Sequence, residues 1–151
     1  MVENSKNEAP NILAALSREK IDQKYSQYVQ IYTDASKDPS GKVGIGCYIR
    51  SFASSPDIEM EARLTDDVAV QTGEMVAVKM ALENVCQLEQ TTTHRRYAIF
   101  TDSLSTIDNL ASSRSRSRPN LLSDMIDLLH NVNSQITVVW VSSHVGITGN
   151  E

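Results

Sequence analysis

The chain has 151 residues, of which 40% are hydrophobic and 22% charged, a balance typical of one soluble globular domain. No apolar run is long enough to cross a membrane, and the polar stretch from Met1 to Pro10 is no signal peptide, so we expect an intracellular protein of unknown compartment. The net charge of −5 argues against a protein that coats nucleic acids through charge alone.

The N-terminal part of the chain gives no sign of chemistry. Residues 1–27 are polar or weakly patterned, so we expect a tail or linker that is disordered or partly helical, and we place the folded domain at residues 28–151. Residues 29–33 then form an apolar run rich in β-branched and aromatic side chains. This run predicts a buried strand that ends directly before Asp34.

Two further strands are predicted to pair antiparallel with the first. The turn residues 38–41 (DPSG) predict a hairpin that leads into residues 42–50. Gly44 and Gly46 leave one face of that second strand bare, which suits the close approach of another backbone. Residues 58–64 alternate apolar with charged side chains, so they predict a half-exposed edge strand.

Residues 72–89 form the clearest helix of the sequence, and Thr72 is the predicted cap at its start. The apolar positions fall on one broad arc, and Glu74 lies in the middle of that arc, in the first turn. A carboxylate on a buried face is costly unless it is paired or bound to a metal. Alternatively, Glu74 only complements the helix dipole and turns out to solvent, and the pattern leaves both interpretations open.

Residues 97–101 predict a second buried strand that ends before an aspartate, Asp102. The tetrads at 31–34 (IYTD) and 99–102 (IFTD) share one pattern, and if their strands lie parallel and adjacent, both carboxylates leave the sheet at the same edge. Carboxylates this close repel unless they share a proton or a cation, and hard oxygen ligands favour Mg²⁺ or Mn²⁺. The structural alternative is that each aspartate starts a turn or caps a helix.

The C-terminal third completes an α/β order. A short helix is predicted from Ser103, and residues 111–119 are rich in serine and arginine, which is typical of a solvated loop and would also suit phosphate contacts. Residues 120–132 have apolar side chains at helical spacing, and residues 136–141 predict a last strand. Three antiparallel strands therefore come first, and helix-linked parallel strands follow.

Four motifs in this order resemble type 1 ribonuclease H domains, most closely those of non-LTR retrotransposon polyproteins. They are residues 32–36 (YTDAS), 73–75 (GEM), 100–103 (FTDS) and 140–151 (WVSSHVGITGNE). The resemblance implies a ribonuclease H-like fold, a five-stranded mixed sheet of order 3-2-1-4-5 with strands 1–3 antiparallel and helices on its faces. It also implies Mg²⁺- or Mn²⁺-dependent cleavage of the RNA strand of RNA–DNA hybrids with two ions, and an upstream reverse transcriptase domain.

The resemblance assigns roles to individual residues. Asp34, Glu74 and Asp102 match the metal-binding carboxylates of the family, and His144 matches a loop histidine that assists proton transfer or product release. These four are the catalytic residues that the resemblance implies. The substrate-binding positions that it implies are Ser36, Thr72, Ser103 and Asn150.

The chain departs from the family pattern at two places. Ala35 stands where the family usually has glycine. The fourth carboxylate of the family lies on a closing helix beyond the last motif, and the sequence ends at Glu151, so we expect that helix to be missing. The alternative function is therefore an inactive remnant that binds RNA or hybrids. A domain for a small phosphorylated ligand is disfavoured, because the sequence has no glycine-rich phosphate loop.

Overall fold

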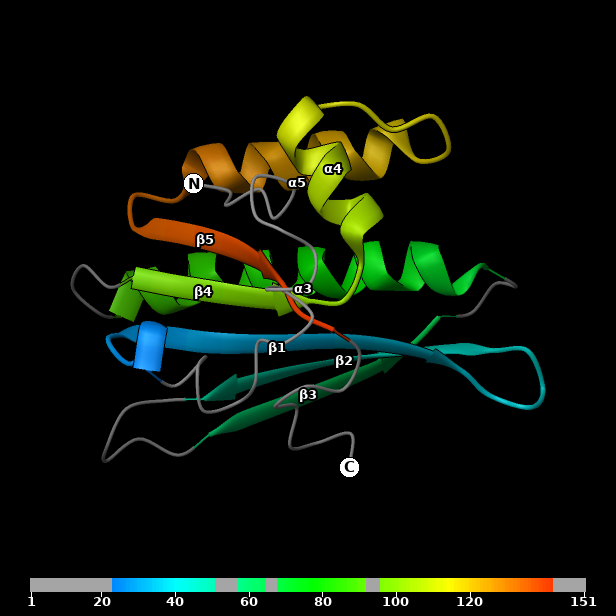
Figure 1. The fold of residues 1–151 in the computed structure, drawn as a ribbon, viewed down its shortest axis with the longest axis horizontal. Helices are drawn as coiled ribbons and strands as arrows, with labels where there is room; N and C mark the ends of the chain where they lie inside the picture. The colour runs from blue at the N-terminus through cyan, green and yellow to red at the C-terminus, as the bar shows by residue number, and fades with distance from the viewer. Residues whose placement is uncertain (1–22, 51–56, 65–67, 92–95, 143–151) are drawn as a thin grey trace.

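A computed structural model of the chain describes residues 23–50, 57–64, 68–91 and 96–142. The elements are strands β1 (Tyr28–Lys37), β2 (Val43–Arg50), β3 (Ile58–Arg63), β4 (Arg96–Thr101) and β5 (Gln135–Trp140), with helices α3 (Val70–Thr91), α4 (Leu104–Ser112) and α5 (Pro119–Asn131). The strands form one sheet of order β3-β2-β1-β4-β5, which confirms the predicted topology (Figure 1). No helix in these four ranges has the length and apolar character needed to span a membrane.

The sheet is antiparallel from β3 to β1 and parallel from β1 to β5, as the sequence predicts. Because successive side chains point to opposite faces, each strand feeds two cores. Ile31 and Ile99 pack with Leu82 of α3 on one face, and α4 and α5 complete that core. Tyr32 and Phe100 belong to the core on the opposite face. Residues 34 and 102 therefore share the face of the aromatic pair.

Strand β1 is longer than predicted. It continues to Lys37, which pairs with Val43 of β2, so Asp34 lies inside the strand opposite Gly46. The predicted end at Thr33 is wrong because backbone hydrogen bonds to β2, which need no apolar side chains, carry the strand further.

The start of α3 also differs from the prediction. The helix begins at Val70, so Thr72 lies inside the first turn, where its backbone N–H donates to the carbonyl of Ala69 at 3.0 Å. The capping role predicted for Thr72 is therefore wrong. Val70 has no side chain that can cap a helix and so gives no start signal in the sequence.

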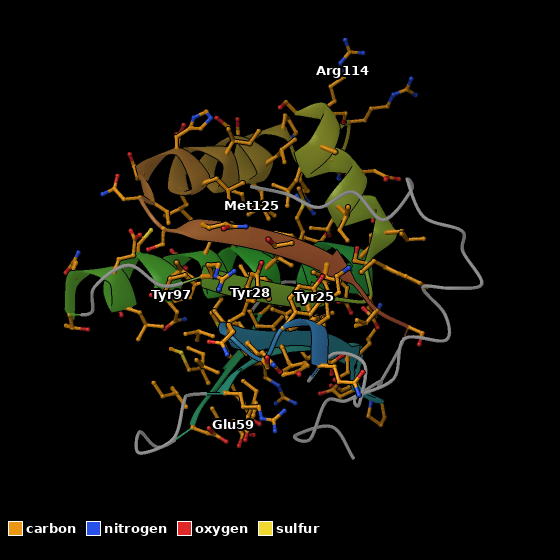
Figure 2. The ribbon with its side chains drawn as sticks, turned by 60° about the vertical axis from the view of Figure 1, so that its left-hand side comes forward. Tyr25, Tyr28, Glu59, Tyr97, Arg114 and Met125 are labelled. Carbon is orange, nitrogen blue, oxygen red and sulfur yellow. The ribbon has the colours of Figure 1, made fainter. Side chains whose placement is uncertain are left out.

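The turn that precedes β1 packs on the sheet face opposite α3 (Figure 2). Tyr25 is only 3% exposed, and its ring meets those of Tyr28 and Phe100 edge-on at centroid distances of 5.1 and 5.3 Å. The side-chain amide of Gln30 donates to the carbonyl of Tyr25 at 3.1 Å. The chain thus contributes to the core before its first strand begins.

Candidate metal centre

The register between β1 and β4 brings two aspartates together. Tyr32 pairs with Phe100 in the parallel ladder, and Asp34 and Asp102 each lie two residues further along. Two residues is the period of a strand, so both carboxylates emerge on the same face and at the same edge. Just before them, the hydroxyl of Thr33 donates to the carbonyl of Phe100 at 2.9 Å and ties the two strands together.

Hydrogen bonds on both sides fix the backbone around Asp102. The indole N–H of Trp140 donates to the carbonyl of Asp102 at 3.2 Å. The next residue, Ser103, is the N-cap of α4, and its Oγ accepts the backbone N–H of Thr106 at 3.2 Å. The carboxylate of Asp102 therefore projects from a backbone that is held from β5 and from α4, which favours a preorganised site.

The third acid reaches the site because α3 packs unusually close to the sheet. A Cβ on Gly73 would lie 2.5 Å from Cγ1 of Val43 and 3.2 Å from Cβ of Ala35, so only glycine permits this approach. The following residue, Glu74, is 7% exposed. The structure thus decides between the two interpretations of Glu74: it points inward rather than to solvent.

Asp34, Glu74 and Asp102 form a compact cluster in which one carboxylate oxygen from each lies within 4.8 Å of the others. Burial raises the pKa of Glu74 from 4.5 to about 9, with further contributions from a hydrogen bond to Asp102 and from the charges of both aspartates. The backbone N–H of Ala35, which donates to Glu74, acts in the opposite direction. Without a cation, Glu74 is therefore protonated at neutral pH.

The donor set fits a divalent cation. Oε2 of Glu74 is buried and has no hydrogen-bond partner among the described residues. A buried polar atom without a partner is costly, and a bound cation removes that cost. The cluster offers only carboxylate oxygens, which are the ligands that Mg²⁺ and Mn²⁺ prefer.

Sequence comparison identifies the family. The family model described as RNase H matches residues 26–151. The chain belongs to the RNase H family. A comparison with curated proteins gives no match.

Solved RNase H structures share the fold of this RNase H domain. One is the RNase H1 of the halophilic archaeon Halobacterium salinarum NRC-1, with a TM-score of 0.60, 16% identity, and coverage of 77% of this chain and 86% of that one. Another is LC11-RNase H1 in complex with an RNA/DNA hybrid, with a TM-score of 0.60, 18% identity, and coverage of 76% and 86%. At these identities the likeness shows the fold alone.

Two grooves of the RNase H domain flank the acidic cluster and contain two of the expected substrate-binding residues. Asp34 and Ser36 line one groove of about 480 Å³ together with Gly44, Gly46 and Glu61, which we call the glycine groove. A second groove of about 410 Å³, the α3–α4 groove, lies between the starts of these two helices and is lined by Thr72 among others. Each groove begins within two residues of a metal-centre acid.

The remaining expected site residues are placed differently. Ser103 is buried, and its hydroxyl is engaged in capping α4. His144 and Asn150 lie outside the described residues, so their roles stay predictions.

The sequence analysis missed two polar residues of the α3–α4 groove. The side-chain amide of Gln71 donates to the hydroxyl of Ser105 at 2.6 Å and links α3 to α4. Both residues line the groove, as does Arg118 from the loop before α5. No sequence pattern joins positions 71 and 105, so their proximity follows only from the fold.

Proposed function

We propose that this RNase H domain hydrolyses the RNA strand of RNA–DNA hybrids in a reaction that depends on Mg²⁺ or Mn²⁺. The observation that carries the proposal is the convergence of Asp34, Glu74 and Asp102 around the unpartnered Oε2 of Glu74. Family membership supports hydrolysis of nucleic acid, and a fold neighbour, LC11-RNase H1, has been solved with an RNA/DNA hybrid.

In this proposal the three carboxylates hold divalent ions, which when bound would activate a water and stabilise the leaving oxygen. Asp34, between the two others on the sheet edge, is the best placed to share ions. Glu74 has to give up its proton when it binds a cation, because its pKa lies near 9 without one. His144 would assist proton transfer or product release, as the family motif implies.

The substrate would cross the metal centre between the two grooves. The glycine groove presents bare backbone beside Asp34, and Ser36 offers a hydroxyl there. On the other side, Thr72 and Arg118 offer a hydroxyl and a cation to the strand. Proteins recognise such hybrids through shape and the 2′-hydroxyl of RNA rather than through base sequence. Asn150 is the further substrate contact that the family motif implies.

Cleavage of a labelled hybrid by the full chain in Mg²⁺ or Mn²⁺ tests this function. We expect RNA-strand cleavage that EDTA stops and that Asp34→Asn lowers by about a thousandfold, because a shared metal ligand is removed. The matched control is Asp127→Asn, an exposed aspartate of α5 that should leave the rate unchanged. Tight, salt-dependent hybrid binding without turnover, unaffected by Asp34→Asn, would establish the non-catalytic alternative instead.

The wider context is a separate part of the proposal. We infer from the four motifs that the domain derives from a non-LTR retrotransposon polyprotein and works beside an upstream reverse transcriptase domain. The coding sequence on both sides of the gene segment tests this inference. An open reading frame without reverse transcriptase motifs upstream would refute the retroelement origin and leave the nuclease proposal untouched.

A further inference from the structure

The loop between α4 and α5 alternates serine with arginine. Residues 113–118 read SRSRSR, and we call them the serine–arginine loop. Arg114, Arg116 and Arg118 are all exposed, and Figure 2 shows Arg114 standing clear of the molecule. Within the described ranges, the ion pairs between side chains involve Arg63 and Lys79 rather than these arginines. The loop thus concentrates uncompensated positive charge on a protein of net charge −5.

Ser117 is the serine of this loop with the densest positive surroundings. It is exposed, with arginines one and three residues before it and another directly after it. It also lines the α3–α4 groove together with Thr72, two residues before Glu74 in the chain. In Figure 1 the loop lies at the end of the molecule where α3 begins. A change of charge at Ser117 therefore acts directly on this groove.

The start of α5 would accommodate an anion at this point. The helix begins at Pro119, its N-cap Arg118 makes no side-chain capping bond, and its first turn has no acidic residue. The only local substitute is the hydroxyl of Ser115, which accepts the backbone N–H of Arg118 at 3.1 Å. The positive end of the helix dipole and the neighbouring arginines both favour negative charge here.

We propose that Ser117 is a phosphorylation site for a serine kinase that recognises arginine, and that the phosphate weakens binding of the hybrid substrate. Oγ of Ser117 attacks the γ-phosphorus of ATP, the bond to the bridging oxygen of ADP breaks, and the hydroxyl proton passes to a base of the kinase. The phosphate adds a charge of about −1.5 to −2 at pH 7 and offsets most of the charge on the three arginines. The regulatory part rests on the proposed function.

The modification itself is tested by incubating the full chain with ATP and a purified arginine-directed serine kinase, followed by peptide mass spectrometry. We expect one phosphate at Ser117, none there in Ser117→Ala, and unchanged incorporation in the control Ser123→Ala, an exposed serine of α5 with no arginine beside it. The modified chain should melt about 1 to 4 °C higher, because the phosphate complements the start of α5. A folded chain that takes up no phosphate at Ser117 would overturn the proposal.

The effect on substrate is tested by hybrid binding, with the same protein before and after phosphorylation, in Ca²⁺ to prevent turnover. We expect roughly tenfold weaker binding and a shallower dependence on salt after modification, because phosphate contacts are lost. Kinase treatment of Ser117→Ala should change nothing. Stoichiometric phosphate at Ser117 with unaltered affinity would refute the regulatory role. Failure of the unmodified chain to bind hybrid would instead refute the proposed function, while mass and melting temperature still decide the modification.

Discussion

The rings of Tyr32 and Phe100 stack with their centroids 4.9 Å apart and an angle of 17° between their planes. Each ring lies two residues before an aspartate of the acidic cluster, on the same face of the sheet. Cross-strand aromatic pairs stabilise neighbouring strands, so this pair fixes the spacing of the two backbones from which Asp34 and Asp102 project. The geometry of the acidic cluster is therefore inherited from packing one strand period away.

Gly73→Ala should destabilise the protein, although alanine normally stabilises a helix relative to glycine by about 1 kcal/mol. The added methyl group would meet Val43 at 2.5 Å and force α3 away from the sheet. We expect a loss of about 1–3 kcal/mol in urea unfolding and a strong fall in hybrid cleavage, because Glu74 moves with the helix.

The double variant Gly73→Ala/Val43→Ala controls for this explanation. Val43→Ala alone should cost about 1–3 kcal/mol, since Val43 is fully buried. Removing the obstructing methyl groups should make the double variant more stable than the sum of the single effects by at least about 0.5 kcal/mol. Strict additivity would show that the contact with Val43 does not position α3.

The pKa of Glu74 predicts how the metal-free protein responds to pH. Between pH 4.5 and about 9 the folded state holds a proton on Glu74 that the unfolded state releases. The contribution of Glu74 to stability is therefore fully present below pH 4.5 and is lost as pH rises towards 9. Glu74→Gln removes this titration, so its stability relative to the wild type should increase from pH 6 to pH 8 in urea unfolding with EDTA.

The same proton sets the pH dependence of metal binding. Because the cation displaces it, Mg²⁺ affinity of the wild type should rise by about tenfold per pH unit between pH 6 and pH 8. Titration calorimetry in buffers of different ionisation enthalpy measures the released proton. In Glu74→Gln the weaker residual binding should lose this slope, and an equal slope in both proteins would show that Glu74 is not the titrating ligand.

Gly46→Ala should separate folding from substrate binding. Gly46 has an ordinary strand conformation, and a Cβ there would meet nothing closer than the carbonyl of Met60 at 3.9 Å. Alanine should therefore stabilise β2 by about 0.5–1 kcal/mol. Its methyl group would narrow the glycine groove, so hybrid affinity should fall severalfold while Mg²⁺ affinity stays constant. Unchanged hybrid affinity would mean that the substrate does not use this groove.

Two buried tyrosines should respond in opposite ways to removal of the hydroxyl group. The hydroxyl of Tyr97 is buried and has no hydrogen-bond partner among the described residues, so Tyr97→Phe should stabilise the protein by about 1 kcal/mol. The hydroxyl of Tyr32 donates to Gln30 at 2.6 Å, so Tyr32→Phe should destabilise it by about 1 kcal/mol. Thermal unfolding of both variants checks the pair, and equal signs would contradict this assignment.

The sequence predicts the sheet and the meeting of Asp34 with Asp102 because both follow from short-range rules. Strand periodicity sets which face a side chain takes, and parallel neighbours end at one edge. The orientation of Glu74 is not predictable in this way. A helical pattern gives the direction of a side chain, whereas its burial depends on the depth to which Gly73 lets α3 approach β1 and β2.

The parts that the sequence does not predict involve contacts between distant or unpatterned residues. Hydrogen bonds to β2 decide the length of β1, so the predicted end at Thr33 falls short. The contact of Tyr25 with Phe100 joins residues 75 positions apart, and no period or motif connects them. The bond between Gln71 and Ser105 is of the same kind.

The burial of Tyr25 has a practical consequence for how this domain is attached to whatever precedes it. Any tether to the N-terminal side reaches Tyr25 before it reaches β1, so tension on the chain is transmitted first to Phe100 and only then to the strand. A recombinant fragment cut at Tyr28 would lose this plug and expose the ring of Phe100. Cloning boundaries for this domain should therefore lie upstream of Lys24.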